Sequence, residues 1–388
     1  MVRSLQSQGK EPSAPGTSPD VALADLARLR ARIDVLDEAI LAQLNARASL
    51  VLQVGRLKQE AGVLPFDAAR ERGILERLAA LNPGPFPTAS IPHVFREIIG
   101  VMRSLEGALR VAYLGPEGTF SHLAARQQFG GQAELVPEPT LPDVIAAVEH
   151  GRVHLALVPV ENTTEGVVTA TLDALVEAEA SICGEVVLRV AHHLLSHSGK
   201  LEDVKRVASI PQALAQCRQW LEAHLPGVDR VETASTAAAA RLAAGDAGVA
   251  AIGSALAAEA WGLATIEASI EDRRDNTTRF VLLGGPQAVP SGNDLTCVLF
   301  TVRRDQSGAL HRLLAPFSKH GVNITSIQSR PLKGKPWEYV FFLDLEGHRD
   351  EPRVAQALEE AAALATAHRI LGSFPRALPR AAAAAGGA

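Results

Sequence analysis

The sequence has 388 residues, and its 38 Lys and Arg against 43 Asp and Glu give a formal net charge of −5. This near balance offers no basic surface for nucleic acid or for an anionic membrane, and no apolar run reaches the ~18 residues of a membrane-spanning helix. The three cysteines lack a CxxC pair, which argues against a disulfide framework or a cysteine zinc site and favours a reducing cytoplasm. At about 150 residues per domain, the length predicts two or three domains.

The two ends of the chain differ from the rest in composition. Residues 1–20 are polar and rich in Ser, Pro and Gly, without the apolar centre of a signal peptide, and residues 377–388 end in a run of alanine and glycine. Because such segments bury too little apolar surface to fold, we expect a disordered leader and a disordered tail.

Residues 21–108 are predicted to be helical almost throughout. Helical spacing runs over 25–60, before the first interrupting proline. A shorter helix fits 67–81, with Asp67 as its N-cap, and a third helix fits 90–109 after a proline-rich loop. The segment is therefore predicted to be an all-α module.

The first helix carries an apolar stripe that contains cations. At 100° per residue, several apolar side chains fall within about 60° of Ile33. They are Leu26, Leu29, Leu36, Ile40, Leu44, Val51 and Val54. Arg47 and Lys58 fall inside the stripe and Arg30 lies at its edge, and an unpaired buried charge is very costly. Either these cations pair within the chain, for instance with Asp37, or they form a pocket for a small polycarboxylate, which Arg matches well.

The length of this helix predicts a second chain. About 36 helical residues extend roughly 50 Å, whereas a domain of about 85 residues has a radius near 12 Å. One chain cannot cover a stripe of that length, so we expect two chains to pack their long helices together.

Several short motifs of this segment occur in a fixed order, namely LRxxIDxLD, Arg47, VGxxK and DxxRE. In order and spacing they resemble the all-helical chorismate mutase family over about 85 residues. The resemblance implies a pericyclic reaction without a nucleophile, helped by substrate folding and by charge stabilisation at the breaking bond. By position, Arg30 (from the partner chain), Arg47 and Arg70 would hold the carboxylates of the substrate. Lys58 would bind the ether oxygen, and Asp67 and Glu71 would bind the ring hydroxyl.

Glu106 departs from the family pattern. It stands in FREIIGVMRSLE where many relatives carry Gln. A Gln donates a hydrogen bond to the ether oxygen at any pH, whereas a Glu donates only when it is protonated. We therefore expect either that Glu106 is held protonated or that mutase activity rises toward acid pH.

Residues 109–285 follow an α/β pattern, in which short Val, Ile and Leu runs alternate with alanine-rich helical stretches. Polar turns follow several of the predicted strands. These turns have a simple structural interpretation, because Thr119 and Ser235 can cap helices and Arg279 can pair with Asp272 or Asp275.

Taken together, six segments of this region resemble prephenate dehydratase. They are GPEGTFSH, VPVENTTEG, SIPQALAQCRQWL, STAAAARLA, AAIGSALAAEAWGL and NTTRF. The resemblance implies a two-lobed α/β domain like that of periplasmic binding proteins. One lobe would comprise about 111–189 with 268–285, and the other about 190–267.

The resemblance also implies a reaction and a set of residues. Prephenate loses its ring carboxylate as CO2 and its 4-hydroxyl as water, and aromatisation drives the reaction, so we expect neither a metal nor a cofactor. Thr278 would donate to the leaving hydroxyl and Arg279 would bind a carboxylate. The other residues implied to line the cleft are Asn162, Thr119, Ser121, Ser209, Gln212 and Gln216. The adjacent His192 and His193 are interpreted as structural.

Residues 294–376 are predicted to form a βαββαβ unit, which is the ferredoxin-like plan. They resemble an ACT domain, an amino-acid sensor. The signature positions implied to bind phenylalanine are Gly308, Ala309, Leu310, Gln328, Ser329 and Arg330. The family usually has Glu where Gln328 stands, so the residue that would pair with the amino group of phenylalanine is neutral. We expect phenylalanine inhibition, the alternative being a purely structural dimerisation module.

These observations predict a cytoplasmic bifunctional enzyme of phenylalanine biosynthesis, acting on chorismate and then on prephenate, with phenylalanine as effector. We expect a homodimer, with a tetramer of paired dimers left open, and no nucleic-acid or membrane partner. One alternative is a dehydratase whose mutase site is impaired, since Glu106 is unusual. Another is a non-catalytic amino-acid-sensing protein, against which Thr278, Arg279 and the cationic stripe argue.

Overall fold

The computed structural model describes residues 19–61, 66–302, 307–332 and 338–377. The chain forms two compact units, residues 1–54 and residues 55–388, and the boundary falls within helix α1 (Pro19–Glu60). In the first unit, the helix exposes most of the predicted apolar stripe, including Ile33 and Ile40 at 55% and 57% exposure, while Leu44 and Val51 are half-buried.

The second unit begins with the last turns of α1 and two further helices, α2 (Ala68–Leu81) and α3 (Ile91–Glu106), the latter preceded by the short 3-10 helix η1 (Thr88–Ser90). The carboxylate of Asp67 accepts a hydrogen bond from the Arg70 backbone N–H, so the predicted N-cap is confirmed. Helix α3 ends three residues earlier than predicted, because Gly107 takes a φ of 151°, which a helix cannot continue through.

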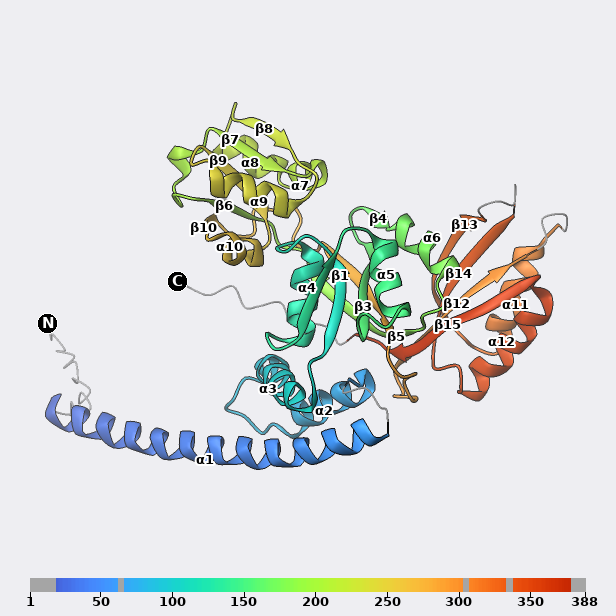
Figure 1. Cartoon of the computed structure of the whole chain (residues 1–388), viewed down its shortest axis with the longest axis horizontal. Helices are drawn as coiled ribbons and strands as arrows, with labels where there is room; N and C mark the ends of the chain where they lie inside the picture. The colour runs from blue at the N-terminus through green and yellow to red at the C-terminus, as the bar shows by residue number, and fades with distance from the viewer. Residues whose placement is uncertain (1–18, 62–65, 303–306, 333–337, 378–388) are drawn as a thin grey trace, which may run out of the picture. The chain divides into compact units, whose positions relative to one another are not determined.

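The next part is an α/β lobe built on a six-stranded sheet of order β2-β1-β3-β11-β5, with β4 paired to β3. Strands β1, β3, β4 and β5 of this sheet are labelled in Figure 1. The strands are β1 (Arg110–Leu114), β2 (Glu134–Glu138), β3 (Leu155–Asn162), β4 (Gly166–Val167), β5 (Ile182–Arg189) and β11 (Thr277–Gly284). The helices are α4 (Phe120–Phe129), α5 (Leu141–Glu149) and α6 (Thr169–Glu177). Strand β11 runs antiparallel between β3 and β5, so a late segment of the chain completes this sheet.

A second lobe has a five-stranded sheet of order β10-β6-β9-β7-β8. Its strands are β6 (His193–Ser196), β7 (Arg206–Ser209), β8 (Asp229–Glu232), β9 (Val249–Gly253) and β10 (Ala264–Glu267). Its helices are η2 (Leu201–Asp203), α7 (Pro211–Gln216), α8 (Arg218–His224), α9 (Thr236–Gly245) and α10 (Ala255–Trp261). The apolar run EVVLRVAHHLL is thus divided between the two sheets, as β5 and β6.

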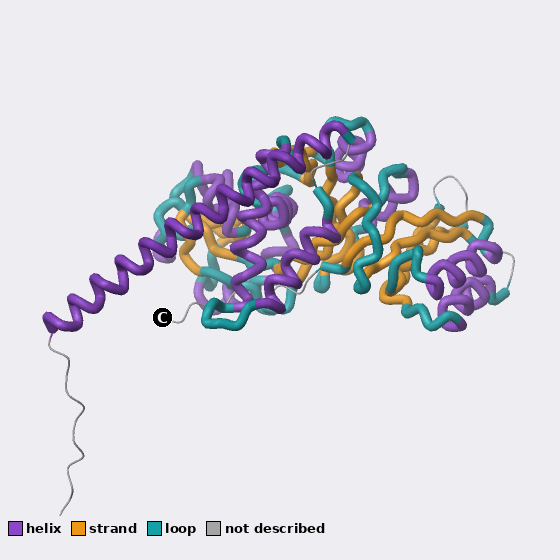
Figure 2. Tube along the Cα trace, turned by 90° about the horizontal axis from the view of Figure 1, so that it is seen from below, coloured by secondary structure: helices purple, strands orange, loops and turns teal. Residues whose placement is uncertain are grey.

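The C-terminal part has the predicted βαββαβ order. Its elements are β12 (Asp294–Thr301), α11 (Ala309–Lys319), β13 (Ile324–Pro331), β14 (Tyr339–Glu346), α12 (Pro352–Leu364) and β15 (Ala367–Pro375). The sheet order β13-β14-β12-β15 is ferredoxin-like, with α11 and α12 side by side against the sheet (Figure 2). Cys297, Phe342 and Leu371 share a core with Val281 and Leu283 of β11, so this sheet packs directly on the first lobe.

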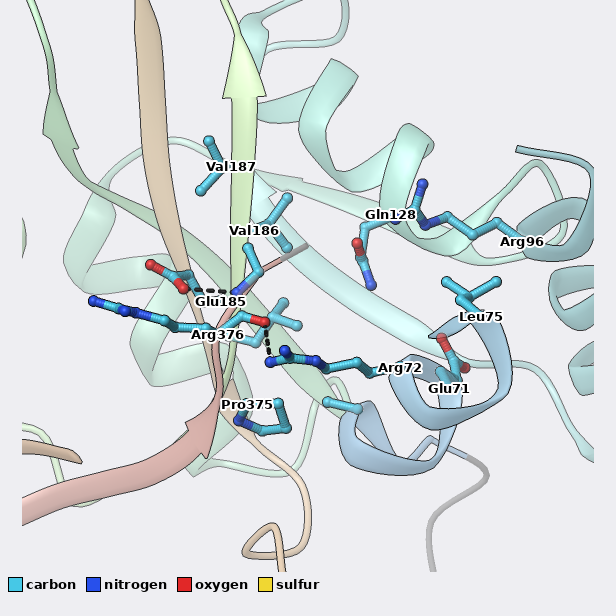
Figure 3. A pocket seen from close by; sticks show the side chains of 13 residues that line it. Glu71, Arg72, Leu75, Arg96, Gln128, Glu185, Val186, Val187, Pro375 and Arg376 are labelled. Carbon is cyan, nitrogen blue, oxygen red and sulfur yellow. Dashed lines mark hydrogen bonds between the residues drawn. The ribbon is translucent and has the colours of Figure 1, made fainter. Parts of the chain in front are cut away.

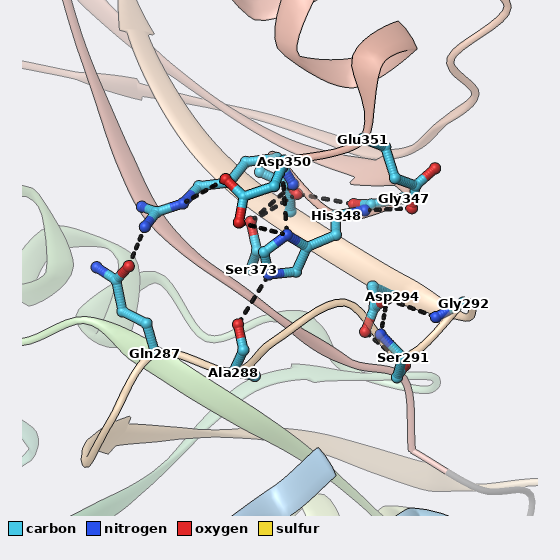
Figure 4. A network of polar contacts seen from close by, with 12 residues as sticks. Gln287, Ala288, Ser291, Gly292, Asp294, Gly347, His348, Asp350, Glu351 and Ser373 are labelled. Carbon is cyan, nitrogen blue, oxygen red and sulfur yellow. Dashed lines mark hydrogen bonds and ion pairs between the residues drawn. The ribbon is translucent and has the colours of Figure 1, made fainter.

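The segment 285–293 between β11 and β12 is fastened to the C-terminal sheet at both ends (Figure 4). His348 Nε2 lies 2.9 Å from the Ala288 carbonyl oxygen. The carboxylate of Asp294 accepts hydrogen bonds from the backbone N–H groups of Ser291 and Gly292, at 2.7 and 3.0 Å. These hydrogen bonds therefore hold the connection against the C-terminal domain.

Candidate functional site

Thr278 is the centre of a polar cluster where the two α/β lobes meet. It is the second residue of β11 and is only 9% exposed. Its hydroxyl oxygen accepts a hydrogen bond at 2.8 Å from the side-chain amide of Asn162, the last residue of β3. The same amide donates at 2.8 Å to the side-chain oxygen of the buried Asn276.

The direction of these hydrogen bonds follows from the backbone. The side-chain oxygen of Asn162 accepts from the backbone N–H groups of Thr164 and Glu165, both at 2.9 Å. Because a backbone N–H can only donate, that atom must be the oxygen, and the other Asn162 atom must be the amide nitrogen. Thr278 is therefore forced to accept from Asn162, which leaves its own hydroxyl proton to be donated elsewhere.

Gln216, at the end of α7 in the second lobe, continues the cluster. Its oxygen accepts from Asn276 Nδ2 at 3.0 Å, and its amide nitrogen donates to Glu165 Oε1 at 2.9 Å. The same oxygen lies 2.9 Å from His192 Nε2, so that nitrogen carries the imidazole proton. Burial lowers the pKa of His192, which keeps the ring neutral. His192, which was interpreted from the sequence as structural, thus forms a hydrogen bond within this cluster and helps to hold Gln216.

The other predicted cleft residues have structural partners or lie apart from these contacts. Thr119 caps α4, since its hydroxyl accepts from the His122 N–H at 3.3 Å and donates to the Leu114 carbonyl at 3.1 Å. Ser209 is fully buried and donates to the Ile252 carbonyl at 2.8 Å. Ser121 is buried and Gln212 is exposed. Of the cleft residues predicted from sequence, the described contacts bring Asn162 to Thr278 and join Gln216 to the same cluster through Asn276.

The turn before Thr119 also touches the second lobe. The Ser254 hydroxyl donates to the Gly118 carbonyl at 2.9 Å. Gly118 has a φ of 87°, and a Cβ there would lie 3.3 Å from the Ala257 Cα atom. Only glycine fits this contact between the lobes without strain.

Arg279 is not part of the Thr278 cluster, because successive side chains of a strand point to opposite faces. Its guanidinium pairs with Glu185 at 2.6 Å and with Asp344 of β14. The two partners expected from sequence are engaged elsewhere. Asp275 pairs with Arg273 at 2.9 Å, and Asp272 accepts from the Gln219 N–H at 3.2 Å.

In the helical module, Lys58 and Glu106 form an ion pair. Lys58 Nζ lies 2.7 Å from Glu106 Oε2, and the two side chains are 25% and 11% exposed. Helices α1 and α3 approach closely here, since a Cβ on Gly55 would lie 3.1 Å from the Glu106 Cα atom. The residue predicted to bind the ether oxygen and the residue that replaces the family's Gln therefore lie together.

Glu71, on the first turn of α2, pairs with Arg103 of α3, which sequence reasoning did not single out. Arg103 is only 5% exposed, and its guanidinium carbon lies 5.4 Å from the ring centroid of Phe66. Burial raises the pKa of the Glu71 carboxyl and Arg103 opposes this effect. The signal in the sequence was a cation inside the apolar run IIGVMRSL.

Asp67 and Arg70 line a cavity of about 180 Å³ together with Lys58. Arg30 and Arg47 lie on α1 in the first unit, where Arg30 is exposed and Arg47 is half-buried.

In the C-terminal domain, Gly308 is the N-cap of α11 with a φ of 72°, and Ala309 and Leu310 begin that helix. Gln328, Ser329 and Arg330 lie on the edge strand β13. Gln328 lines a small cavity beside Arg279, and Arg330 pairs with Asp173 of α6 at 2.8 Å. The two signature segments thus lie on different elements of the C-terminal domain, one at the start of α11 and the other on β13.

Within the described residues, no cluster of three or more His, Cys, Asp or Glu side chains could hold a metal ion, and no helix is long and apolar enough to cross a bilayer.

Comparison with known proteins assigns each part of the chain. Residues 29–107 match the model of chorismate mutase type II, residues 111–288 that of prephenate dehydratase, and residues 298–363 that of the ACT domain. The bifunctional chorismate mutase/prephenate dehydratase of Aquifex aeolicus is 44% identical over 360 residues, which cover 92% of this chain and 99% of that protein. The enzyme of the same name from Pseudomonas aeruginosa is 41% identical over 359 residues, covering 91% and 98%.

The chain belongs to the bifunctional chorismate mutase/prephenate dehydratase family. The predicted fold class and the two predicted enzyme activities, an isomerase and a carbon–oxygen lyase, are confirmed. Because the mutase domain is present, the bifunctional interpretation is favoured over a dehydratase alone.

Solved structures match the part after the helical module. The prephenate dehydratase of Arthrobacter aurescens, solved in complex with L-Phe, has a TM-score of 0.64 at 37% identity, covering 69% of this chain and 90% of that one. A chain described as GqqA, a novel type of quorum quenching acylase, has a TM-score of 0.64 at 36% identity, covering 69% and 98%. The prephenate dehydratase of Staphylococcus aureus has a TM-score of 0.61 at 30% identity, covering 69% and 100%.

Proposed function

We propose that Thr278 is the hydrogen-bond donor to the leaving hydroxyl of prephenate, and that Asn162 fixes the direction of its hydroxyl group. The observation that carries this role is the orientation of the Asn162 amide by the backbone, which makes Thr278 accept from Asn162 and keep its own proton to donate. As the C–C bond to the ring carboxylate breaks, its electron pair enters the ring and the C–O bond to the 4-hydroxyl breaks. Negative charge then develops on the departing oxygen, where a positioned donor lowers the barrier.

In the helical module, Lys58 is proposed to bind the ether oxygen, beside Glu106. The carboxylates of chorismate are assigned to Arg30 from a second copy of the chain, Arg47 and Arg70, and the ring hydroxyl to Asp67 and Glu71. The support is the cavity that Lys58 shares with Asp67 and Arg70.

Phenylalanine is proposed to inhibit the dehydratase by binding at the ACT domain. The site would comprise Gly308–Leu310 at the start of α11 and Gln328–Arg330 on β13. Support comes from the relative of Arthrobacter aurescens, whose structure was solved in complex with L-Phe. Full activity at saturating phenylalanine would instead favour a structural module.

The enzyme is proposed to act as a homodimer in the cytoplasm. The exposed apolar stripe of α1 is the surface that a second copy would cover. Each Å² of apolar surface buried there would stabilise the dimer by about 25 cal/mol. The three cysteines are buried free thiols, which suits a reducing compartment.

One assay tests these proposals in sequence. The purified full-length protein is given chorismate and then prephenate, and phenylpyruvate is followed with and without phenylalanine. We expect both substrates to yield phenylpyruvate, and Thr278→Val to abolish the second step while chorismate still disappears. Equal dehydratase rates for Thr278→Val and the wild type would exclude Thr278 as the donor.

A further inference from the structure

Arg279 joins the strand that carries Thr278 to the C-terminal domain. Its Nε atom donates to Glu185 Oε1 on the neighbouring strand β5 at 2.6 Å, and its guanidinium also pairs with Asp344 on β14. The side chains of Arg279, Glu185 and Asp344 are 19%, 7% and 9% exposed. Burial alone would lower the pKa of the guanidinium, but the two carboxylates together raise it above its usual range, so Arg279 stays charged.

Glu185 has a second partner that also comes from the C-terminal domain. Its Oε2 atom accepts from the backbone N–H of Ala377, just beyond β15, at 2.8 Å. In Figure 3, Arg376 lies between Glu185 and Arg72 of α2, and the Arg72 guanidinium donates to the Arg376 carbonyl at 2.6 Å. The position of Arg279 on β11 is thus set by contacts with both β14 and the segment that follows β15.

The Arg279 side chain also lies beside a residue of the C-terminal domain that is predicted to bind phenylalanine. A cavity of about 40 Å³ is lined by Arg279 and Asp344 and also by Gln328 of β13. Strand β13 pairs directly with β14, with Gln328 opposite Phe342. A shift of β13 and β14 would therefore act on Asp344 and so on Arg279.

We infer that Arg279 is a positioning residue, and that the clamp Glu185–Arg279–Asp344 lets the ACT sheet fix the geometry of Thr278 one peptide away. The inference rests on the proposed role of Thr278, and its regulatory consequence rests on the proposed phenylalanine inhibition. It replaces the expectation that Arg279 binds a substrate carboxylate. A displacement of about 1 Å is enough to lower a rate a hundredfold when a catalytic group must be aligned.

A role of Arg279 in binding substrate and a role in positioning Thr278 predict different kinetic changes when Arg279 is replaced. A substrate ligand contributes to ground-state binding, so its loss raises KM for prephenate. A positioning residue leaves substrate contacts in place, so its loss lowers kcat with little change in KM. Asp344 separates them best, because it contacts Arg279 from another domain and is no candidate for binding an anionic substrate.

The test uses full-length Asp344→Asn, which keeps the side chain's size and removes its charge. We expect kcat for prephenate to fall at least tenfold, KM to change less than twofold, and half-inhibition by phenylalanine to shift at least fivefold. Arg279→Lys, which keeps the charge but not the forked geometry, should recover part of the kcat that Arg279→Gln loses. Chorismate consumption by each variant reports that the helical module is folded, and urea unfolding reports on the rest of the chain.

Asp173→Asn is the matched control, since Asp173 also pairs with an ACT-domain arginine, Arg330, across the same two domains. Its kcat for prephenate should equal that of the wild type. An unchanged kcat in Asp344→Asn, or a rise in KM alone in Arg279→Gln, would overturn the inference. A wild-type protein that leaves prephenate unchanged would instead refute the proposed function, so the two failures are distinguishable.

Discussion

The direction of one hydrogen bond at Thr278 decides whether its hydroxyl can act as a donor. Asn162→Asp retains the shape of the side chain but replaces the donating amide with an accepting oxygen. The Thr278 proton would then turn toward the new carboxylate, away from the substrate. We expect kcat for prephenate to fall by about 10²–10³, the usual cost of losing one positioned donor.

The measurement is phenylpyruvate formation by Asn162→Asp beside Thr278→Val. Similar losses are expected, although only one variant lacks the hydroxyl. Thr163→Ser, a change on the neighbouring exposed turn residue, serves as the control and should retain wild-type activity. Near-normal turnover by Asn162→Asp would mean that Thr278 does not donate.

The ion pair of Lys58 and Glu106 makes a separate prediction for the mutase. A carboxylate held 2.7 Å from the Lys58 ammonium accepts hydrogen bonds but cannot donate one to the ether oxygen until it is protonated. We expect wild-type mutase activity to rise toward acid pH, and Glu106→Gln to lose that dependence and to exceed the wild-type rate at pH 7.5. Chorismate consumption from pH 5 to 8 measures this, with Glu97→Gln on the same helix as control. If Glu106→Gln has the same pH dependence of mutase activity as the wild type, Glu106 does not cause that dependence.

At the scale of elements, local signals were predictable and distant pairings were not. Asp67 was assigned as an N-cap because capping depends on residues three apart, and the structure has that bond. The partners of Arg279 lie 94 and 65 residues away along the chain, beyond any local pattern. Successive side chains of a strand point to opposite faces, so the position of Thr278 and Arg279 on one predicted strand could have separated them. The family motif, in which the two residues are adjacent, led instead to both being assigned to the substrate.

Helix α1 supports a prediction about assembly. Ile33 and Ile40 lie on the apolar stripe and are more than half exposed in one chain. Glutamate at both positions would place charges in the face that a second copy is proposed to cover, so we expect the mass to fall from dimer to monomer. The mutase should lose activity, because Arg30 from the second copy is missing, while the dehydratase persists.

Val35→Glu is the control for this change. Val35 is 64% exposed and lies about 200° around the helix from Ile33, on the opposite face. Light scattering on the three proteins gives the mass. A dimer that survives both substitutions in the stripe would place the interface elsewhere.

At the scale of the whole molecule, buried imidazoles predict a loss of stability in acid. Burial lowers the pKa of His122, His154, His192 and His193 from the ordinary value of 6.5. The unfolded chain therefore binds protons more readily. The stability they contribute is complete above about pH 6.5 and is lost as the pH falls through their folded values, by at most about 1.4 kcal/mol per pH unit for each group.

Urea unfolding at pH 7.5 and 5.5 measures this fall in the free energy of unfolding. Two of the three tryptophans, Trp220 on α8 and Trp261 on α10, lie in the second lobe, so the fluorescence change includes unfolding of that lobe. Glu71 opposes the trend in the helical module, since burial raises its pKa and favours folding in acid. Equal stability at the two pH values would show that the imidazoles stay accessible to protons.

The two reactions use separate residue sets within one chain, and this predicts complementation. Lys58 and Glu106 lie on α1 and α3, whereas Asn162 and Thr278 lie on β3 and β11, and the described contacts link neither residue of one pair to the other pair. A mixture of Lys58→Ala, which lacks the mutase step, and Thr278→Val, which lacks the dehydratase step, should therefore convert chorismate to phenylpyruvate through released prephenate. The product should appear after a lag that shortens as the concentration of Lys58→Ala rises, because that protein consumes the free intermediate. If Thr278→Val instead consumes only about one equivalent of chorismate per site and the mixture forms no phenylpyruvate, prephenate is not released from the molecule that makes it.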